Sequence, residues 1–380
     1  MIDVLVIGGG PVGLATAIHC TLAGLSVTVA EPRAAPVDKA CGEGVMPAAV
    51  RRLAALGVRP DGHPLRGIRY LDAAHRADAP FRHGDGLGVR RTVLHGALAA
   101  RAAALGIPVI PVRVTAFERH ADHVTAAGVE ARYLVAADGL HSTIRRVLER
   151  SAPARSAPRH PRASAPRYGL RRHYLVAPWT DLVEVHWTPG AEAYVTPVSR
   201  DVVGIGLLFA GPRAGEPHRG DLACDGHGAA ADGAAADGVR AGAGGHFAAR
   251  LSAFPALRDR LGEAAPASEV RGAGPLRQDV RRRAYDRVLL VGDASGYVDA
   301  LTGEGIGVGL AHAEALAACL AAGRPADYER AWRRASAPAW RFTAGLLWSR
   351  NQPLLGPRIV PVAQRLPRLF AALVNHAAQA

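Results

Sequence analysis

Three glycines, Gly8, Gly10 and Gly13, follow the apolar run Val4–Ile7 in the spacing G-x-G-x-x-G. This spacing suits the binding of a pyrophosphate. The first glycine permits a tight turn, the second lets phosphates approach the backbone, and the third lets a helix pack closely on the strand. The glycines therefore point to a bound dinucleotide.

The elements around these glycines are predicted from the same stretch. A helix over Val12–Ala23, with Pro11 before it, would direct its free N–H groups and positive dipole end at the phosphates. The next strand, Leu25–Ala30, ends at Glu31, where a ribose hydroxyl needs an acceptor. Because this strand–turn–helix–strand context is present, we predict a nucleotide site rather than a glycine turn without a ligand.

Two later apolar strands also end in an aspartate beside a glycine. The strand Ala131–Ala136 leads to Asp138-Gly139, and the strand Val288–Val291 leads to Gly292-Asp293. A discontinuous nucleotide-binding domain with a second β domain inserted would give this order of elements. We therefore predict an α/β fold. Asp293 is either a cofactor ligand or a residue that caps the following turn.

Composition narrows the class of protein. The 380 residues carry a net charge of +13, almost entirely from arginine, since Lys39 is the one lysine. No basic stripe interleaved with aromatic residues is present, so nucleic-acid binding is not expected. The four cysteines are far apart, which indicates neither a zinc site nor a disulfide framework. His120-x-x-His123 lacks a third ligand, so no metal site is predicted.

The chain has no basic N-terminal region and no apolar run of about twenty residues. We expect a cytoplasmic protein without stable membrane insertion.

The remaining elements are predicted from local patterns. We expect short antiparallel strands over 65–90, a helix over 91–105, and meander strands over 109–117 and 123–127. Four strands between 167 and 209 should form one antiparallel sheet. We expect a helix over 247–261, and helices in the last fifty residues broken by prolines at 353, 357, 361 and 367. Residues 151–166 are interpreted as a surface linker, and residues 211–246 as a low-complexity insertion.

Taken together, the motifs resemble those of FAD-dependent oxidoreductases and monooxygenases of the para-hydroxybenzoate hydroxylase fold. The matching segments are the glycine motif with Glu31 and Arg33, the D-G motif at Asp138, the G-D motif at Asp293, and an R-x-x-L helix beginning at Arg91. The resemblance implies a discontinuous Rossmann-like FAD-binding domain (1–65, 90–166, 270–325). It also implies an inserted antiparallel substrate domain (66–89, 167–269) and a helical C-terminal segment (326–380).

Residue roles follow from this resemblance. The residues expected to bind FAD are Gly8, Gly10, Pro11, Val12, Gly13, Glu31, Arg33, Arg91, Val114, Asp138, Gly139, Gly292, Asp293, Gly303, Gly305 and Ile306. The substrate is expected at the inserted sheet, near Tyr174, His186, Trp187 and Tyr194, because a ligand pocket needs an apolar wall with a few polar groups. These rings serve either as a pocket wall or as the core beneath the sheet.

Two segments resemble the geranylgeranyl-reductase-like subgroup. They are Lys39-x-Cys41-Gly42-Glu43 and the stretch Leu301–Ile306, which reads L-T-G-E-G-I. Ala300 departs from the subgroup, which usually has proline there. Cys41, Glu43 and Glu304 are the candidate catalytic residues near the flavin. Cys41 is either a reactive thiol or a small buried residue.

The resemblance implies an enzyme with NAD(P)H or a flavin-reducing partner as electron source. Our first hypothesis is a flavin monooxygenase that hydroxylates or epoxidises an aromatic or polycyclic small molecule through a C4a-hydroperoxide. The alternative is a flavin-dependent reductase of isoprenoid C=C bonds. A third hypothesis is a flavin-bound binding or regulatory protein without turnover.

Overall fold

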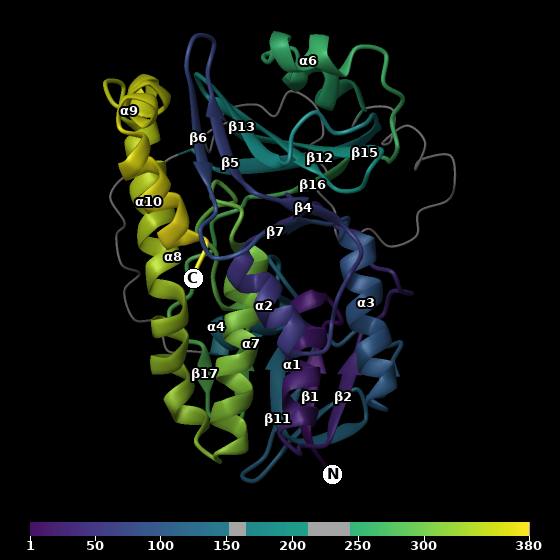
Figure 1. The fold of residues 1–380 in the computed structure, drawn as a ribbon. Coiled ribbons are helices and arrows are strands. Elements are labelled where there is room, and N and C mark those ends of the chain that lie inside the picture. Colours follow the sequence, from purple (N-terminus) through teal and green to yellow (C-terminus); the bar gives the residue numbers. More distant parts are fainter. Residues whose placement is uncertain (152–164, 212–243, 380) are drawn as a thin grey trace.

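The computed structural model of the protein describes residues 1–151, 165–211 and 244–379. Most of the predicted linker, most of the predicted insertion, and Cys224 lie outside these residues. Figure 1 shows two layers of β structure, one above the other, with long helices running along both. The lower part holds the N-terminal strand and its helices, and the upper part holds the second sheet.

The lower sheet has eight strands, and its main path runs β17-β18-β11-β1-β2-β8. Strands β18, β11, β1, β2 and β8 are parallel to their neighbours. β10 pairs antiparallel with β11 and with β9, and β17 pairs antiparallel with β18. The strand bounds are β1 (Ile2–Ile7), β2 (Val27–Ala30), β8 (Val109–Ile110), β9 (Glu118–Arg119), β10 (Val124–Ala126), β11 (Val129–Ala136), β17 (Ala284–Tyr285) and β18 (Val288–Leu290).

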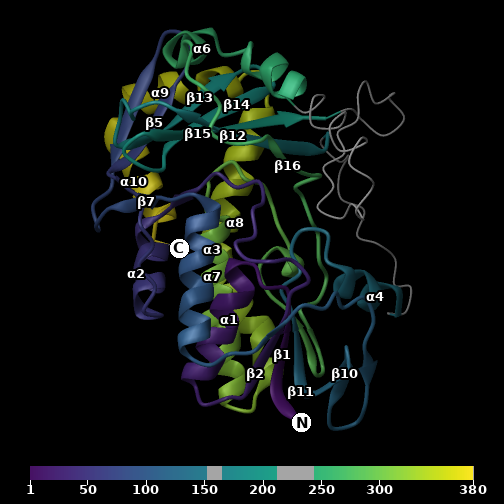
Figure 2. The ribbon, with the colours of Figure 1, turned by 90° about the vertical axis from the view of Figure 1, so that its right-hand side faces the viewer.

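Helices cover both faces of this sheet (Figure 2). Val4 and Val6 of β1 share one core with helices α1 (Pro11–Leu22), α3 (Arg91–Ala104) and α7 (Gly305–Ala321). Leu5 and Ile7 share the other core with α4 (Thr143–Ser151). Successive side chains of a strand point to opposite faces, so the continuous apolar run of β1 is explained by burial on both sides.

The upper sheet has seven strands in the order β16-β12-β15-β14-β13-β5-β6. The four predicted strands are present in one sheet, together with a hairpin from earlier in the chain. One pair departs from the antiparallel prediction, because β5 lies parallel to β13. The bounds are β5 (Gly67–Leu71), β6 (Arg76–Pro80), β12 (Arg167–Leu175), β13 (Leu182–Thr188), β14 (Ala191–Pro197), β15 (Val202–Ala210) and β16 (Arg271–Ala273).

A small sheet of β3 (Gly44–Val45), β7 (Gly86–Gly88) and β4 (His63–Leu65) is accompanied by α2 (Pro47–Ala55). One face of the upper sheet packs on residues 244–251, which are helical, and on α6 (Pro255–Leu261). The single helix predicted over 247–261 is therefore interrupted at residues 252–254, directly before Pro255. Proline lacks an N–H and fits the first turn of a helix rather than its interior.

The C-terminal region is helical, as predicted. It contains α8 (Tyr328–Asn351), α9 (Ile359–Arg365) and α10 (Pro367–Ala377), with short 3₁₀ turns at Pro325–Asp327 and Gly356–Arg358; a further 3₁₀ turn, Gly292–Ser295, follows β18. Pro367 begins α10, and Pro361 lies in the first turn of α9, where a missing N–H costs no helical hydrogen bond.

The strand predicted over 109–117 is wrong beyond Ile110. Only Val109–Ile110 is a strand, and it pairs parallel with β2 rather than in a meander. Among the described residues, no helix combines the length and the apolar character that crossing a bilayer requires.

Candidate functional site

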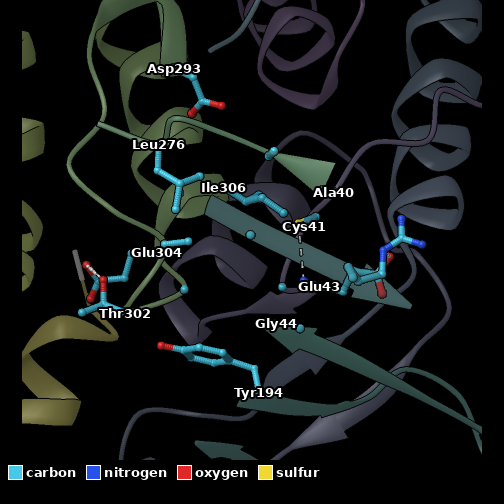
Figure 3. A pocket seen from close by; sticks show the side chains of 18 of the residues that line it. Ala40, Cys41, Glu43, Gly44, Tyr194, Leu276, Asp293, Thr302, Glu304 and Ile306 are labelled. Atoms are coloured by element: carbon cyan, nitrogen blue, oxygen red, sulfur yellow. Dashed lines mark hydrogen bonds and ion pairs between the residues drawn. The ribbon is translucent and has the colours of Figure 1, made fainter. Parts of the chain in front are cut away.

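A large pocket lies where the strand ends of the lower sheet meet the inner face of the upper sheet. Its walls come from the glycine turn, from the loop 39–46, from β13 and β14, and from the start of α7. In Figure 3, Asp293 and Tyr194 stand at opposite ends of the view, with Cys41 and Ile306 between them. The pocket therefore brings together segments from nearly the whole length of the chain.

The three glycines of the first motif have different physical roles. A Cβ on Gly8 would lie 2.5 Å from the carbonyl oxygen of Ala137, and one on Gly13 would lie 1.9 Å from that of Gly8. Packing within the protein therefore requires both glycines. Gly10 lines the pocket, and the one described atom within 4 Å of a Cβ placed there is Arg91 Nη2, at 3.7 Å. Protein packing does not require glycine at position 10, whereas a ligand lying on the backbone would.

Glu31 and Arg33 form a fixed pair beside this turn. The buried Glu31 Oε2 accepts a hydrogen bond of 2.9 Å from Gly9 N, and Arg33 Nε donates to Glu31 Oε1 at 2.7 Å. Burial raises the pKa of Glu31, but the bonds from Arg33 and Gly9 outweigh it and hold the pKa below its ordinary value. Arg33 lines the pocket while Glu31 lies behind it.

Two buried polar atoms at this end of the pocket have no hydrogen-bond partner among the described residues. The buried atoms Arg91 Nε and Asp138 Oδ1 make no hydrogen bond to described residues. Asp138 Oδ2 is used, since it accepts from the N–H groups of Thr143 and Ile144 at the start of α4. Buried polar atoms are almost always satisfied, so these two indicate a ligand that carries both acceptors and donors.

Cationic groups and a helix terminus also converge here. Burial lowers the pKa of Lys39, while the nearby carboxylates of Asp293 and Asp138 act to raise it. Gly305 and Ile306, at the first positions of the seventeen-residue helix α7, line the pocket. Unpaired N–H groups and the helix dipole favour negative charge at that point. The donor set fits FAD, whose pyrophosphate is anionic and whose ribose and ribityl hydroxyls need acceptors.

The D-G motif and the G-D motif are joined by one arginine. Arg145 Nη1 lies 3.3 Å from the carbonyl oxygens of both Asp293 and Ala294, and Arg145 Nη2 donates to Leu140 O at 2.8 Å. The side chain is buried, so these bonds replace its hydration. Arg145 therefore fixes the loop that carries Asp138 and the loop that carries Asp293 relative to each other.

Glu304 directly precedes Gly305, at the border between the polar end of the pocket and its apolar part. It occupies the N-cap position of α7 without a side-chain capping bond, it is buried, and its Oε1 has no hydrogen-bond partner among described residues. Burial raises the pKa of Glu304 to about 8, and Thr302 Oγ1, 3.5 Å from Oε2, offsets this slightly. The carboxyl group is therefore protonated at neutral pH. Around it lie Tyr70, Tyr194 and Tyr297, all of which line the pocket.

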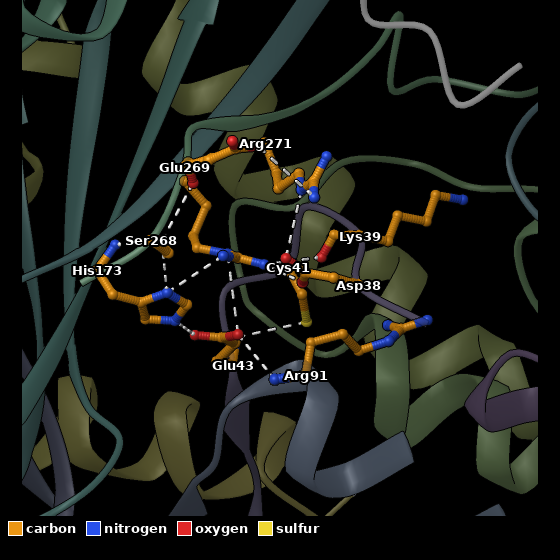
Figure 4. Close-up of polar contacts among 10 residues, drawn as sticks. Asp38, Lys39, Cys41, Glu43, Arg91, His173, Ser268, Glu269 and Arg271 are labelled. Carbon is orange, nitrogen blue, oxygen red and sulfur yellow. Dashed lines mark hydrogen bonds and ion pairs between the residues drawn. The ribbon is translucent and has the colours of Figure 1, made fainter. Parts of the chain in front are cut away.

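A buried polar cluster borders the other side of the loop 39–46 (Figure 4). Glu43 Oε2 lies 2.5 Å from His173 Nε2, and Glu43 Oε1 accepts from Arg91 N at 2.8 Å. His173 Nδ1 lies 2.8 Å from Ser268 Oγ, and Arg171 contacts both Asp38 and Glu43. Glu43 has a positive φ of 59°, a conformation that side chains rarely adopt. The cluster fixes the loop that carries Cys41 against β12.

The Cys41 thiol faces a buried environment. Its sulfur accepts a hydrogen bond of 3.4 Å from Glu43 N, and burial raises the pKa of the thiol. A raised pKa keeps the sulfur as a neutral thiol, which is a poor nucleophile.

The structure separates the four residues expected at the substrate. Tyr194 lines the pocket and donates from its hydroxyl to Leu301 O at 2.8 Å. Trp187 packs on Tyr70 in the core beneath the sheet, outside the pocket lining. Tyr174 packs on Phe247 at the opposite face. His186 contacts Glu184 Oε2 at 3.3 Å, again away from the pocket. Val114, expected at the cofactor, lies in the core around α4.

Sequence reasoning missed part of the pocket wall. Ile68, Phe342, Val374 and Ala378 line it from β5, α8 and the end of α10. Each is an ordinary apolar residue in an apolar stretch, so no local signal distinguishes it from a core residue.

Comparison with known proteins agrees with this geometry. Residues 1–159 match the family described as FAD binding domain. The chain is 28% identical to a menaquinone reductase of Mycolicibacterium smegmatis over 358 residues, covering 87% of this chain and 79% of that protein. It is 25% identical to a digeranylgeranylglycerophospholipid reductase of Methanococcus vannielii over 330 residues, covering 81% of this chain and 74% of that protein.

Two further similarities cover a smaller share of the other protein. A 3-(3-hydroxy-phenyl)propionate/3-hydroxycinnamic acid hydroxylase of a Mycobacterium species is 31% identical over 181 residues, which is 41% of this chain and 31% of that protein. The solved structure of CmlS, a flavin-dependent halogenase, superposes with a TM-score of 0.72 at 21% identity, over 92% of this chain. The chain spans 64% of the length of CmlS, so this likeness concerns the fold.

The fold and the site together define a flavin-dependent oxidoreductase. The chain carries an FAD-binding domain over residues 1–159, its fold is similar to that of the flavin-dependent halogenase CmlS, and a digeranylgeranylglycerophospholipid reductase is among its relatives.

Proposed function

We propose that this enzyme reduces a C=C bond in the isoprenoid chain of a lipid. The observation that carries the proposal is the buried, protonated carboxyl group of Glu304 at the border of the apolar part of the pocket. Saturating an isolated C=C bond requires two electrons and two protons. One proton comes with the electrons, and the second needs an acid inside a pocket from which water is excluded.

The residues that would hold the cofactor are those at the polar end of the pocket. Gly10, Arg33 and Arg91 suit the pyrophosphate, Asp138 and Asp293 suit hydroxyl groups, and Gly305 with Ile306 suits the flavin ring. When bound and reduced, FAD supplies two electrons and one of the two protons.

Glu304 would supply the other proton. Its buried Oε1 makes no hydrogen bond to described residues, so no group of the described protein competes for its proton. The walls nearby, Ile68, Val183 and Leu208, are apolar and bind hydrocarbon without directing it through hydrogen bonds. After transfer, the carboxylate regains a proton from solvent before the next turnover.

The relatives that match most of the chain support the same class of substrate. Their names identify one as a reductase of menaquinone and the other as a reductase of a digeranylgeranyl lipid. Both of these substrates contain isoprenoid chains. Similarity to the hydroxylase covers 41% of this chain, and it favours the monooxygenase predicted from the sequence as a second candidate.

The test is a single turnover without oxygen. The FAD-loaded protein, reduced with dithionite and freed of excess dithionite, is mixed with a geranylgeranyl lipid that carries no quinone, and flavin absorbance and product mass are followed. We expect reoxidation of the flavin and a product that has gained two hydrogens. Glu304→Gln should slow this step by about a hundredfold or more. A product that gains one oxygen atom, formed only in air, would instead establish the monooxygenase.

The source of electrons is predicted to be NAD(P)H or a flavin-reducing partner, and this assay does not depend on it. Dithionite replaces it in the assay, so the outcome depends only on the substrate and on oxygen.

A further inference from the structure

The C-terminal helices expose an unusual number of large apolar side chains. Seven of the thirteen large hydrophobic residues that are exposed in the described chain lie between residues 348 and 373. They are Trp348, Leu354, Leu355, Val362, Leu366, Leu369 and Leu373. We call these seven residues the C-terminal apolar patch. Exposed apolar side chains are common singly, but a cluster marks an interaction surface.

The patch runs from the end of α8, at Trp348, to α10, with Val362 in α9 and Leu369 and Leu373 in α10. Phe370, Ala371 and Val374 of α10 are buried against the protein, while Leu366, Leu369 and Leu373, spaced by three and four residues, are 50%, 52% and 45% exposed. The spacing of four residues places Leu369 and Leu373 on one face of α10, and Leu366 directly precedes that helix. In Figure 1 these helices lie along one edge of the molecule, beside β6. α10 is thus apolar toward the protein and apolar toward the outside.

Exposed arginines lie among the patch residues in the sequence. From Arg330 to Ala380 the sequence contains eight arginines and neither aspartate nor glutamate, and three of the eight, Arg330, Arg333 and Arg350, pair with carboxylates. Arg365 and Arg368 are exposed next to the leucines, and neither forms an ion pair with a carboxylate of the described residues. Arg358 is also exposed, and its Nη1 donates to the carbonyl oxygen of Leu354. Helices that lie in the headgroup region of a bilayer typically combine leucine and tryptophan with arginines that have no carboxylate partner.

We propose that the C-terminal apolar patch docks the protein on the surface of an anionic phospholipid bilayer. The leucines would enter the acyl boundary, and Arg358, Arg365 and Arg368 would contact lipid phosphates. A second copy of this chain fits less well, because pairing two such patches would bring unpaired arginines of like charge together. Since no described helix can span a membrane, binding would be interfacial.

Docking here would place the bilayer one helix away from the pocket. Leu373 points outward, whereas its neighbour Val374 lines the pocket, as does Phe342 of α8. Bilayer binding itself does not depend on which reaction the pocket catalyses, so it can be measured without turnover.

The experiment is flotation of the FAD-loaded full chain with vesicles. One set contains phosphatidylcholine alone and the other contains about one third phosphatidylglycerol, which supplies the anionic surface. We expect binding to the anionic vesicles that is about tenfold or more tighter than to the neutral ones and that weakens as salt is added.

Two variants locate the surface. Leu366→Gln/Leu369→Gln/Leu373→Gln should weaken binding by at least about tenfold, and Arg365→Glu/Arg368→Glu should do the same on anionic vesicles. The matched control is Leu22→Gln/Leu175→Gln, whose leucines are 51% and 53% exposed but lie elsewhere. This control should bind as the unchanged protein does.

Binding that both patch variants retain would overturn the proposal, as would equal binding to neutral and anionic vesicles. Light scattering without lipid provides a further check. If the unchanged protein is a dimer that the leucine variant splits, the patch is a contact between copies and the proposal is wrong. Should the leucine variant lose FAD or melt early, the arginine variant decides alone, because it alters only exposed side chains.

Discussion

Glu43 Oε2 and His173 Nε2 lie 2.5 Å apart, and both side chains are almost completely buried. This contact ties the loop that carries Cys41 to strand β12 of the upper sheet. The loop and the strand are separated by 130 residues in the sequence. The wall of the pocket is therefore held by a polar contact between the two parts of the fold and not by apolar packing alone.

Removing the Glu43 carboxylate should destabilise the protein strongly. In Glu43→Gln, His173 loses its carboxylate partner inside the protein, whereas Arg171 keeps Asp38. Stranding a buried partner in this way costs about 3–5 kcal/mol. Urea unfolding followed by circular dichroism measures the loss. Glu118→Gln is the matched control, because the Glu118 side chain is 80% exposed and its substitution should change stability by less than about 0.5 kcal/mol. Equal midpoints for the two variants would show that the cluster contributes little.

A bulky residue at position 10 should abolish FAD binding without unfolding the protein. The described protein leaves room for a side chain there, so Gly10→Val would collide with the ligand and not with the chain. Flavin content after purification and the melting temperature are the two measurements. Gly96→Ala is the control, since it lies in α3 with no described atom within 4 Å of the added methyl group. It should keep the flavin and melt at the same or a slightly higher temperature. A flavin-loaded Gly10→Val protein would contradict the assignment of the glycine turn.

Asp293→Ala should weaken FAD binding about ten- to a hundredfold, because a lost charge-assisted hydrogen bond costs about 1.5–3 kcal/mol. Asp293 lines the pocket on a 3₁₀ turn, and its side chain contributes little to the core. Titration of the apoprotein with FAD gives the dissociation constant, and thermal melting without FAD should show little change. An unchanged affinity for FAD would show that Asp293 serves only as a turn residue.

Glu304 gives the protein a pH dependence of known sign. Its pKa is raised from 4.5 to about 8, so between these values the unfolded chain has released a proton that the folded chain keeps. Stability from this group is complete below pH 4.5 and declines as the pH rises toward 8. Glu304→Gln lacks this decline, so its stability relative to the unchanged protein should rise from acidic to alkaline pH by several kcal/mol, on the order of 5 at most.

Denaturant melts of both proteins across this range provide the test. A difference in stability that stays constant with pH would show that Glu304 ionises normally. Turnover of the unchanged enzyme should fall above pH 8, as the acid loses its proton.

Trp187→Ala should lower stability by about 3–5 kcal/mol, the usual cost of removing a buried tryptophan. Its ring packs 5.2 Å from Tyr70, centroid to centroid, and does not line the pocket. In contrast, Tyr194→Phe removes only the hydrogen bond to Leu301 and should cost about 1 kcal/mol while raising KM. If Trp187→Ala raised KM and left the melting temperature intact, Trp187 would belong to the pocket instead.

The sequence predicted the local units of this fold well. The glycine turn, β1, α1 and Glu31 form one continuous stretch, so the pattern of that stretch contains the whole unit. The aspartates at Asp138 and Asp293 are recognisable for the same reason, because each follows its own strand directly.

The far wall of the pocket could not be predicted in this way. Whether an aromatic residue on a strand faces the pocket depends on the register of the sheet. Tyr174 pairs with Val203 and faces the outer core, whereas Tyr194 pairs with Val185 and faces the pocket. The strand predicted over 109–117 failed because the stretch beyond Ile110 forms no ladder, and an apolar pattern cannot report that.

Gly10 and Ala378 line the same cavity. During synthesis, the glycine turn can form soon after its strand and helix have left the ribosome, but the cavity lacks a wall until the last described helix has arrived. A nascent chain can therefore have a folded nucleotide-binding unit before it has an enclosed chamber. Enclosure, and with it the exclusion of water from the reacting end, therefore depends on the docking of α10.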